Sequence, residues 1–330
     1  MDITHELKVA ITAVRLASTV TQTVQANLVT EDTLQKKDRS PVTVADFASQ
    51  AVICKALAEA FPDDPIVGEE DAQELREPGN ATLLDSVVSH VAKAQAGASQ
   101  DDVLSWIDRG GATPDAATKR YWTLDPIDGT KGFLRAEQYA IALALIEDGK
   151  VVLGVLGCPN LPQAADGRGS QGVLMAATLG QGAVSLPLNA ASFEGTPIRV
   201  SDIQDTAHAR FCESVESGHS NQSDSANVAQ TLGITAEPVR MDSQAKYAAV
   251  GRGQASIYLR LPTSADYREK IWDHAAGSIV VQEAGGTVTD AFGKPLDFTL
   301  GRKLENNRGI IATNGHIHDP VVTAVAQAIG

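Results

Sequence analysis

The segment DPIDGT, residues 125–130, combines two carboxylates three positions apart with a glycine and a threonine. Pro126 has no backbone N–H group and stiffens the turn, so both carboxylates can face one centre. Gly129 allows a ligand to approach the backbone, and the amides of Gly129 and Thr130 can point at an anion if a helix begins there. We interpret the segment as part of a metal-assisted phosphate site. The alternative is a capped turn that carries two solvated acids.

Three further segments carry carboxylates that could join the same centre. The acidic pair Glu69-Glu70 follows a strand-like segment, Asp273 stands in a WDH motif, and Asp46 lies near the predicted start of a helix. Taken singly, an acidic pair is commonly a solvated surface, and Asp46 or Asp273 could be helix N-caps. Together, four acidic segments at the ends of elements can converge. Oxygen ligands without a Cys–His cluster favour Mg²⁺ over zinc.

The N-terminal part of the chain must supply elements that position these acids. Apolar residues recur at helical spacing over residues 3–24, which predicts a long amphipathic helix. Ser40-Pro41 should interrupt regular structure, and a second helix should run from about Asp46 to Ala60. Ile66-Val67 is interpreted as a short strand that ends at the acidic pair, and residues 83–91 as a helical patch.

Strand patterns dominate from Tyr121 onward. Residues 121–124 are strand-like and lead directly into Asp125, and two apolar runs joined by Asp148-Gly149 predict a hairpin. Other strands are expected at 173–177, 255–261 and 309–312, and helices at 223–232 and 273–284.

Composition and charge restrict the class of protein. Hydrophobic residues make up 43% of the chain and charged residues 21%, as in ordinary soluble globular proteins. Lys and Arg number 27 against 41 Asp and Glu, so the net charge of −14 gives nucleic acid no general reason to bind. No run approaches the ~18 apolar residues of a membrane span, and the first residues lack a leader pattern. With three cysteines no disulfide framework is expected, and we expect a cytoplasmic monomer that contacts no membrane.

The acidic motifs resemble those of the lithium-sensitive, magnesium-dependent phosphatase superfamily that contains inositol monophosphatase and fructose-1,6-bisphosphatase. The resemblance rests on GEE at 68–70, DPIDGT at 125–130 and WDHAAG at 272–277. It is most specific to the 3'(2'),5'-bisphosphate nucleotidases of the fungal salt-tolerance type, through residues 37–43, 216–220, 241–247 and 259–262. Asp71 departs from the pattern, since a small hydroxyl residue often follows the acidic pair in this family.

Carried over position by position, the resemblance implies roles for individual residues. The metal ligands would be Glu69, Asp125, Asp128, Asp273 and the carbonyl of Ile127, holding two or three Mg²⁺ ions, with Li⁺ and Na⁺ as inhibitors. Asp46 and Thr130 would orient and deprotonate the attacking water, and the amides of Gly129 and Thr130 would receive the scissile phosphate. The substrate would also contact Glu216, Gly218, His219, Ser243, Lys246, Arg260 and Asp273.

The resemblance also implies an α+β fold of five alternating layers, αβαβα, with the site between two domains. A stretch rich in Pro, Asn and Gly near Pro159 places the boundary between an N-terminal α+β domain, residues 1–158, and a C-terminal α/β domain, residues 159–330. The N-terminal domain would carry most of the metal ligands, and the C-terminal domain the nucleotide-side residues and Asp273.

The implied reaction is hydrolysis of the 3'-phosphate of adenosine 3',5'-bisphosphate, or of 3'-phosphoadenylyl sulfate, in sulfate assimilation and salt tolerance. An inositol phosphate 1-phosphatase is the alternative enzyme. The long region between Glu70 and Asp125 and the nucleotide-side segments favour the nucleotidase. A catalytically inactive metal or nucleotide sensor would be expected to lack Asp46 or Thr130, and both are present.

Overall fold

The computed structural model describes residues 3–28, 40–215, 222–262, 264 and 266–329. Its helices are α1 (Thr4–Leu28), α3 (Ser40–Ala60), α4 (Ala81–Ala94), α5 (Gln100–Asp108), α6 (Thr130–Leu134), α7 (Gln222–Thr231), α8 (Ala245–Gly251), α9 (Ala275–Glu283) and α10 (His318–Ile329). None of these helices combines the length and the apolar composition that crossing a membrane requires.

The larger sheet holds seven strands in chain order: β1 (Ile66–Gly68), β2 (Arg120–Asp128), β3 (Ala140–Glu147), β4 (Lys150–Pro162), β5 (Gln171–Thr178), β6 (Gly182–Pro187) and β7 (Thr196–Pro197). β1 is parallel to β2, and the other neighbouring pairs are antiparallel. β3 and β4 form the expected hairpin. Asp148 and Gly149 turn it with φ of 47° and 74°, the left-handed backbone that a tight hairpin turn requires.

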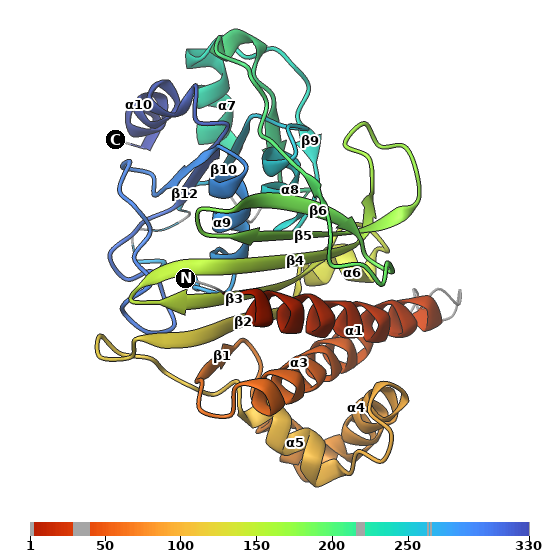
Figure 1. Ribbon diagram of the computed structural model, residues 1–330. Helices are drawn as coiled ribbons and strands as arrows, with labels where there is room; N and C mark the ends of the chain where they lie inside the picture. The colour runs from red at the N-terminus through yellow and green to blue at the C-terminus, as the bar shows by residue number, and fades with distance from the viewer. Residues whose placement is uncertain (1–2, 29–39, 216–221, 263, 265, 330) are drawn as a thin grey trace.

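The second sheet holds five strands in the order β11-β12-β10-β8-β9. Their bounds are β8 (Phe211–Glu213), β9 (Val239–Arg240), β10 (Ile257–Arg260), β11 (Thr287–Thr289) and β12 (Ile310–Thr313). Helices and sheets alternate through the molecule (Figure 1): α1 with α3, the seven-stranded sheet, α8 with α9, the five-stranded sheet, and α7 with α10. The expected α+β sandwich of five layers is confirmed.

Both faces of the larger sheet are buried, as the apolar run of β3 requires. Ile141, Leu143 and Leu145 belong to the core under α1 and α3, whereas Ala140, Ala142, Ala144 and Ile146 belong to the core under α8 and α9. Small residues on the second face let α9 approach the sheet closely. A Cβ atom added to Gly154 of β4 would lie 2.4 Å from Ile279 Cγ2. This packing fixes α9, and with it the residues just before α9, against the sheet.

The structure corrects the expected start of the second helix. α3 begins at Ser40 rather than near Asp46. Proline is tolerated in the first turn of a helix, because its missing N–H would have no intrahelical partner there. Asp46 therefore lies inside the helix and is no N-cap. The sequence reading also missed α5, which begins with a capping box between Ser99 and Asp102.

The division into two domains stays a prediction, but Pro159 does not mark a break in the fold. This residue lies inside β4, and strands from both sides of it pair in the larger sheet. By strand pairing, the chain passes from one sheet to the other only after Pro197. A local cluster of turn-forming residues misses this, because pairing of strands depends on distant parts of the chain.

Candidate active site

The edge formed by β1 and β2 brings two of the acidic segments together. Parallel pairing places Gly68 beside Leu124, so Glu69, which follows the last residue of β1, lies beside Asp125 of β2. Helix α3 holds this edge through Gln50. Its amide donates to the Glu70 carbonyl at 2.6 Å and accepts from the Glu70 N–H at 3.0 Å. Because Gln50 lies four residues after Asp46, the same face of α3 presents both side chains to this edge. We call the edge with Glu69, Glu70 and Asp125 the acidic edge.

An irregularity in β2 turns both DPIDGT carboxylates to one side of the sheet. Asp125 pairs with Ala142 and Asp128 with Ala140, so β2 has one residue more than β3 between these pairs. In a regular strand, residues three apart point to opposite faces, and one extra residue restores the same face. The proline of the motif fits here because a bulge needs one donor fewer, and the Ser49 hydroxyl donates to the Pro126 carbonyl at 3.0 Å.

Two left-handed residues meet where the motif ends. Gly129, with φ of 91°, precedes α6, and Ser243, with φ of 69°, precedes α8. A Cβ atom at Gly129 would lie 2.8 Å from Ser243 Cβ, so only glycine fits this approach. The contact brings the N-terminus of α6 against the C-terminal half of the chain.

A pocket of about 560 Å³ lies at this junction. The predicted site residues that line it are Glu69, Asp125, Ile127, Asp128, Gly129, Thr130, Ser243, Lys246, Arg260 and Asp273. Asp46 does not line the pocket; it is 8% exposed and close enough to Glu69, Glu70 and Asp125 for their charges to interact. The predicted contacts Glu216, Gly218 and His219, and residues 37–39 of the recognised pattern, lie outside the described residues.

Burial and mutual repulsion raise the pKa values of the carboxylates at and beside the acidic edge. Burial, followed by repulsion from Glu69 and neighbouring acids, raises the pKa of Asp125 well above its ordinary value, and burial with repulsion from Glu70 and Glu69 does the same for the pKa of Asp46. Solvent reaches the Glu69 side chain, yet partial desolvation and the charges of Asp273, Glu70 and Asp128 raise its pKa to about 8. Burial also raises the pKa of Asp273 to about 6, although Arg260 opposes this.

The acidic edge fits a hard divalent cation. Its donors are all oxygen atoms, the kind of ligand that Mg²⁺ prefers. Oδ1 of Asp125, which is 2% exposed, has no hydrogen-bond donor in the described part of the chain. A buried carboxylate oxygen without a donor is costly unless a cation compensates its charge. These residues could therefore hold Mg²⁺.

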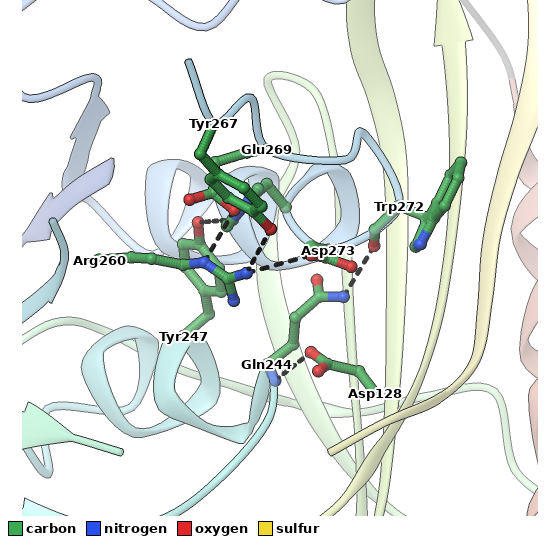
Figure 2. Close-up of polar contacts among 9 residues, drawn as sticks. Asp128, Gln244, Tyr247, Arg260, Tyr267, Glu269, Trp272 and Asp273 are labelled. Atoms are coloured by element: carbon green, nitrogen blue, oxygen red, sulfur yellow. Dashed lines mark hydrogen bonds and ion pairs between the residues drawn. The ribbon is translucent and has the colours of Figure 1, made fainter. Parts of the chain in front are cut away.

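The opposite wall is a closed network of hydrogen bonds (Figure 2). Arg260 Nε donates to Glu269 Oε2 at 2.8 Å, and Arg260 Nη2 approaches Asp273 Oδ2 at 3.5 Å and the Tyr267 hydroxyl at 3.2 Å. His274 contacts the same Glu269 oxygen at 3.1 Å through Nε2 and the Tyr247 hydroxyl at 2.8 Å through Nδ1. Glu269, Asp273 and His274 place one ligand atom each within 4.8 Å of one another. However, Arg260 and His274 already contact Oε2 of Glu269, so this oxygen is not available to a metal ion.

Lys246 is the less constrained cation of this wall. The side chain is 4% exposed, and its Nζ lies 5.2 Å from the centroid of the Tyr258 ring. Burial lowers the pKa of Lys246, while Asp128 opposes that shift. Within the described residues Lys246 forms no ion pair with a carboxylate, unlike Arg260. An anion entering the pocket would therefore meet a cation that is not ion-paired with any described carboxylate.

Gln244 links the two walls. Its backbone N–H donates to Asp128 Oδ2 at 2.6 Å, and its side-chain amide donates to the Trp272 carbonyl at 2.8 Å (Figure 2). Its side-chain oxygen accepts from the Gly277 N–H at 3.0 Å. The acid of β2 and the segment before Asp273 are therefore held by one residue.

Sequence reasoning missed several residues of the site. Gln50 follows Asp46 at helical spacing, and this signal could have identified it as a second polar residue on one face. No comparable pattern marks Glu269 or Tyr267, which lie in a loop and reach Arg260 only through the fold. Gln244 lies in the recognised segment 241–247, but its role depends on contacts with two distant segments.

Comparison with known proteins adds independent information. The sequence model described as "Inositol monophosphatase family" matches residues 2–329. The 3'(2'),5'-bisphosphate nucleotidase of Schizosaccharomyces pombe is 46% identical, with 99% of this chain and 96% of that protein covered. The protein of the same name from Emericella nidulans is 45% identical, with 100% and 99% covered. A solved inositol monophosphatase from Zymomonas mobilis superposes with a TM-score of 0.65 at 18% identity, covering 99% of each chain, and shows the fold alone.

Proposed function

The chain belongs to the inositol monophosphatase family, and from this premise we propose that it is a metal-dependent phosphomonoesterase that removes the 3'-phosphate of adenosine 3',5'-bisphosphate. One observation carries the proposal: a single pocket has carboxylates on one wall and Lys246 and Arg260 on the other. A bisphosphate needs both, because cations must neutralise the phosphate that is cleaved while other positive groups hold the phosphate that remains. The name of the relatives, 3'(2'),5'-bisphosphate nucleotidase, supports this substrate class.

We expect Mg²⁺ as the cofactor, with two or three ions per site. The residues that would hold it are Glu69, Asp125, Asp128, Asp273 and the carbonyl of Ile127. Bound Mg²⁺ neutralises phosphate charge and makes water easier to deprotonate near pH 7. Li⁺ and Na⁺ would inhibit by occupying one cation position.

The chain's own groups supply the rest of the reaction. The attacking water would lose a proton to Asp46 by way of the Thr130 hydroxyl while its oxygen bonds to phosphorus. The bond from phosphorus to O3' would break, and O3' would take a proton from solvent water to leave as the hydroxyl of AMP. The amides of Gly129 and Thr130, at the start of α6, would donate to the phosphate oxygens. Ser243, Lys246 and Arg260 would hold the remainder of the nucleotide, and Glu216, Gly218 and His219 stay proposed contacts.

The same site would accept 3'-phosphoadenylyl sulfate, which differs from the bisphosphate only at the 5'-group. Both compounds belong to sulfate activation, so we place the enzyme in sulfate assimilation and, through inhibition by Na⁺ and Li⁺, in salt tolerance. We expect it to act as a cytoplasmic monomer.

The test is a phosphate-release assay on adenosine 3',5'-bisphosphate, 3'-AMP and inositol 1-phosphate, each with Mg²⁺ and with EDTA. We expect the bisphosphate to give the highest kcat/KM and EDTA to abolish release. A preference for inositol 1-phosphate would replace the nucleotidase with an inositol phosphate phosphatase. Undiminished activity in EDTA would contradict the metal mechanism.

A further inference from the structure

Arg302 lies in the loop between β11 and β12 and is not among the residues that line the pocket. Its backbone is attached to the segment that leads to Asp273. The Ile271 N–H donates to the Arg302 carbonyl at 3.2 Å, and the Leu304 N–H donates to the Glu269 carbonyl at 2.9 Å. Two backbone hydrogen bonds therefore attach residues 302 and 304 to the residues shortly before Asp273.

The side chain of Arg302 reaches the other acidic segment. Nη2 donates to the carbonyl of Gly68 at 2.5 Å, and Gly68 directly precedes Glu69. Nη1 donates to the carbonyls of Ala112 at 3.1 Å and Gly110 at 3.4 Å, in the loop beside β1. The guanidinium of Arg302 thus donates its hydrogen bonds to backbone carbonyls and not to the Glu69 carboxylate.

The same guanidinium stacks on Trp272. Its Cζ lies 4.7 Å from the ring centroid, within the range of a cation–π contact, and Trp272 is buried. Figure 2 shows the Trp272 ring turned away from the network of Arg260 and Glu269, so this contact is separate from that network. Arg302 therefore touches the residue before Glu69 and the residue before Asp273 at once.

We infer that Arg302 is a positioning residue that sets the spacing between Glu69 and Asp273 for cation binding. The planar fork is required, because lysine cannot bond two separate carbonyls and stack on an indole at the same time. The inference rests on the proposed function in one respect, that the acidic edge binds Mg²⁺. It goes further in assigning metal affinity to a side chain that contacts no metal.

Direct binding of Mg²⁺, measured by isothermal titration calorimetry without substrate, tests this inference. The variants are Arg302→Met, Arg302→Lys and the matched control Arg15→Met. Arg15 also donates to backbone carbonyls, those of Leu188 at 3.1 Å and Ser192 at 2.9 Å, and lies over an aromatic ring, with 5.7 Å from its Cζ to the Phe193 centroid. Arg15 lies in α1 and contacts the end of β6 and the residues after it, whereas the acidic edge lies at β1 and β2, toward the opposite end of the sheet. Thermal melts of every variant accompany the titrations.

We expect Arg302→Met to raise the Kd for Mg²⁺ about 10–100-fold, as loss of a group that orients metal ligands does elsewhere. Arg302→Lys should raise the Kd nearly as much, whereas Arg15→Met should lower Tm and leave the Kd unchanged. If Arg302→Met does not fold, Arg302→Lys decides.

Wild-type affinity in a folded Arg302 variant, or an equal loss in Arg15→Met, would overturn the positioning role alone. A wild-type chain that binds no Mg²⁺ would overturn the proposed function, and this inference with it.

Discussion

The two walls of the pocket differ in how their charges are compensated. On the acidic edge, Asp125 and Glu69 face one another, and burial and repulsion raise the pKa of each. On the opposite wall, Arg260 bonds Glu269, and His274 closes the network. Although burial raises the pKa of Glu269, His274 and Arg260 lower it below its ordinary value. The acidic edge therefore needs a ligand to compensate its charges, whereas Arg260, Glu269 and His274 of the opposite wall already compensate one another.

Because of this difference, we expect the two walls to have different roles in binding. A wall with uncompensated carboxylates binds cations strongly and is destabilising without them. The paired groups Arg260, Glu269 and His274 keep their geometry when substrate arrives, so they need little ordering on binding. Substitutions in the two walls should consequently have opposite effects on stability.

The largest combined effect on activity and stability is expected from Asp125→Asn on the acidic edge. The variant should lower kcat/KM by at least about 10²–10³-fold, because a charged group at the reaction centre is lost. In EDTA its Tm should exceed that of the wild type, because one of the repelling charges is gone. Phosphate release and thermal melts measure the two quantities. A variant that loses both activity and Tm in EDTA would show that Asp125 is compensated within the protein.

Asp46→Asn should reduce kcat by about 10²–10⁴-fold, the usual contribution of a general base. Its Tm should not fall, because Asp46 lies inside α3 and caps nothing. Ser99→Ala is the control, since Ser99 caps α5 through a bond from the Asp102 N–H. That change should cost about 1 kcal/mol of unfolding free energy and leave kcat intact. Full activity in folded Asp46→Asn would remove the base from the mechanism.

The opposite wall yields a contrast between Lys246 and Arg260. Lys246→Met should weaken kcat/KM for adenosine 3',5'-bisphosphate roughly 10–100-fold more than for 3'-AMP, which lacks the second phosphate. Arg260→Met should lower kcat/KM for both substrates and also lower Tm, because buried Glu269 would lose its ion pair with Arg260. If Lys246→Met lowers kcat/KM equally for both substrates, Lys246 does not contact the second phosphate and Arg260 becomes the candidate for that contact.

Features of the fold and the site that depend on neighbouring residues could be predicted from the sequence, whereas features that depend on contacts between distant segments could not. Local patterns predicted the long first helix, the hairpin of β3 and β4, and the DPIDGT segment, because each is specified by neighbouring residues. The predicted start of α3, near Asp46, was wrong, because a proline that would break the interior of a helix is accepted in its first turn. The roles of the predicted site residues stay predictions, although the structure gathers most of them in one pocket.

Long-range contacts escaped the sequence reading. Arg302 meets Gly68 and Trp272 only because the loop after β11 passes beside β1, and no local motif encodes that approach. Pro159 lies in a turn-like composition yet continues β4, because pairing with β5 outweighs local preference.

The smallest effect is expected in the pH dependence of stability. The folded pKa values of Glu69, about 8, Glu70, about 7, and Asp273, about 6, lie above the ~4 of an unfolded carboxyl group. Between these limits the folded chain binds more protons than the unfolded chain, so its unfolding free energy must fall as pH rises.

In EDTA we therefore expect Tm to decrease from pH 5 toward pH 8, and with Mg²⁺ at about 100 times its Kd, stabilisation of about 2.7 kcal/mol should offset the loss. Melts across this range, with Glu69→Gln and the exposed control Asp101→Asn, measure the slope. Glu69→Gln should flatten it, because one titrating group is removed, and Asp101→Asn should not. If the slope in EDTA is unchanged by Glu69→Gln, the acidic edge is compensated without a cation and the contrast between the walls fails.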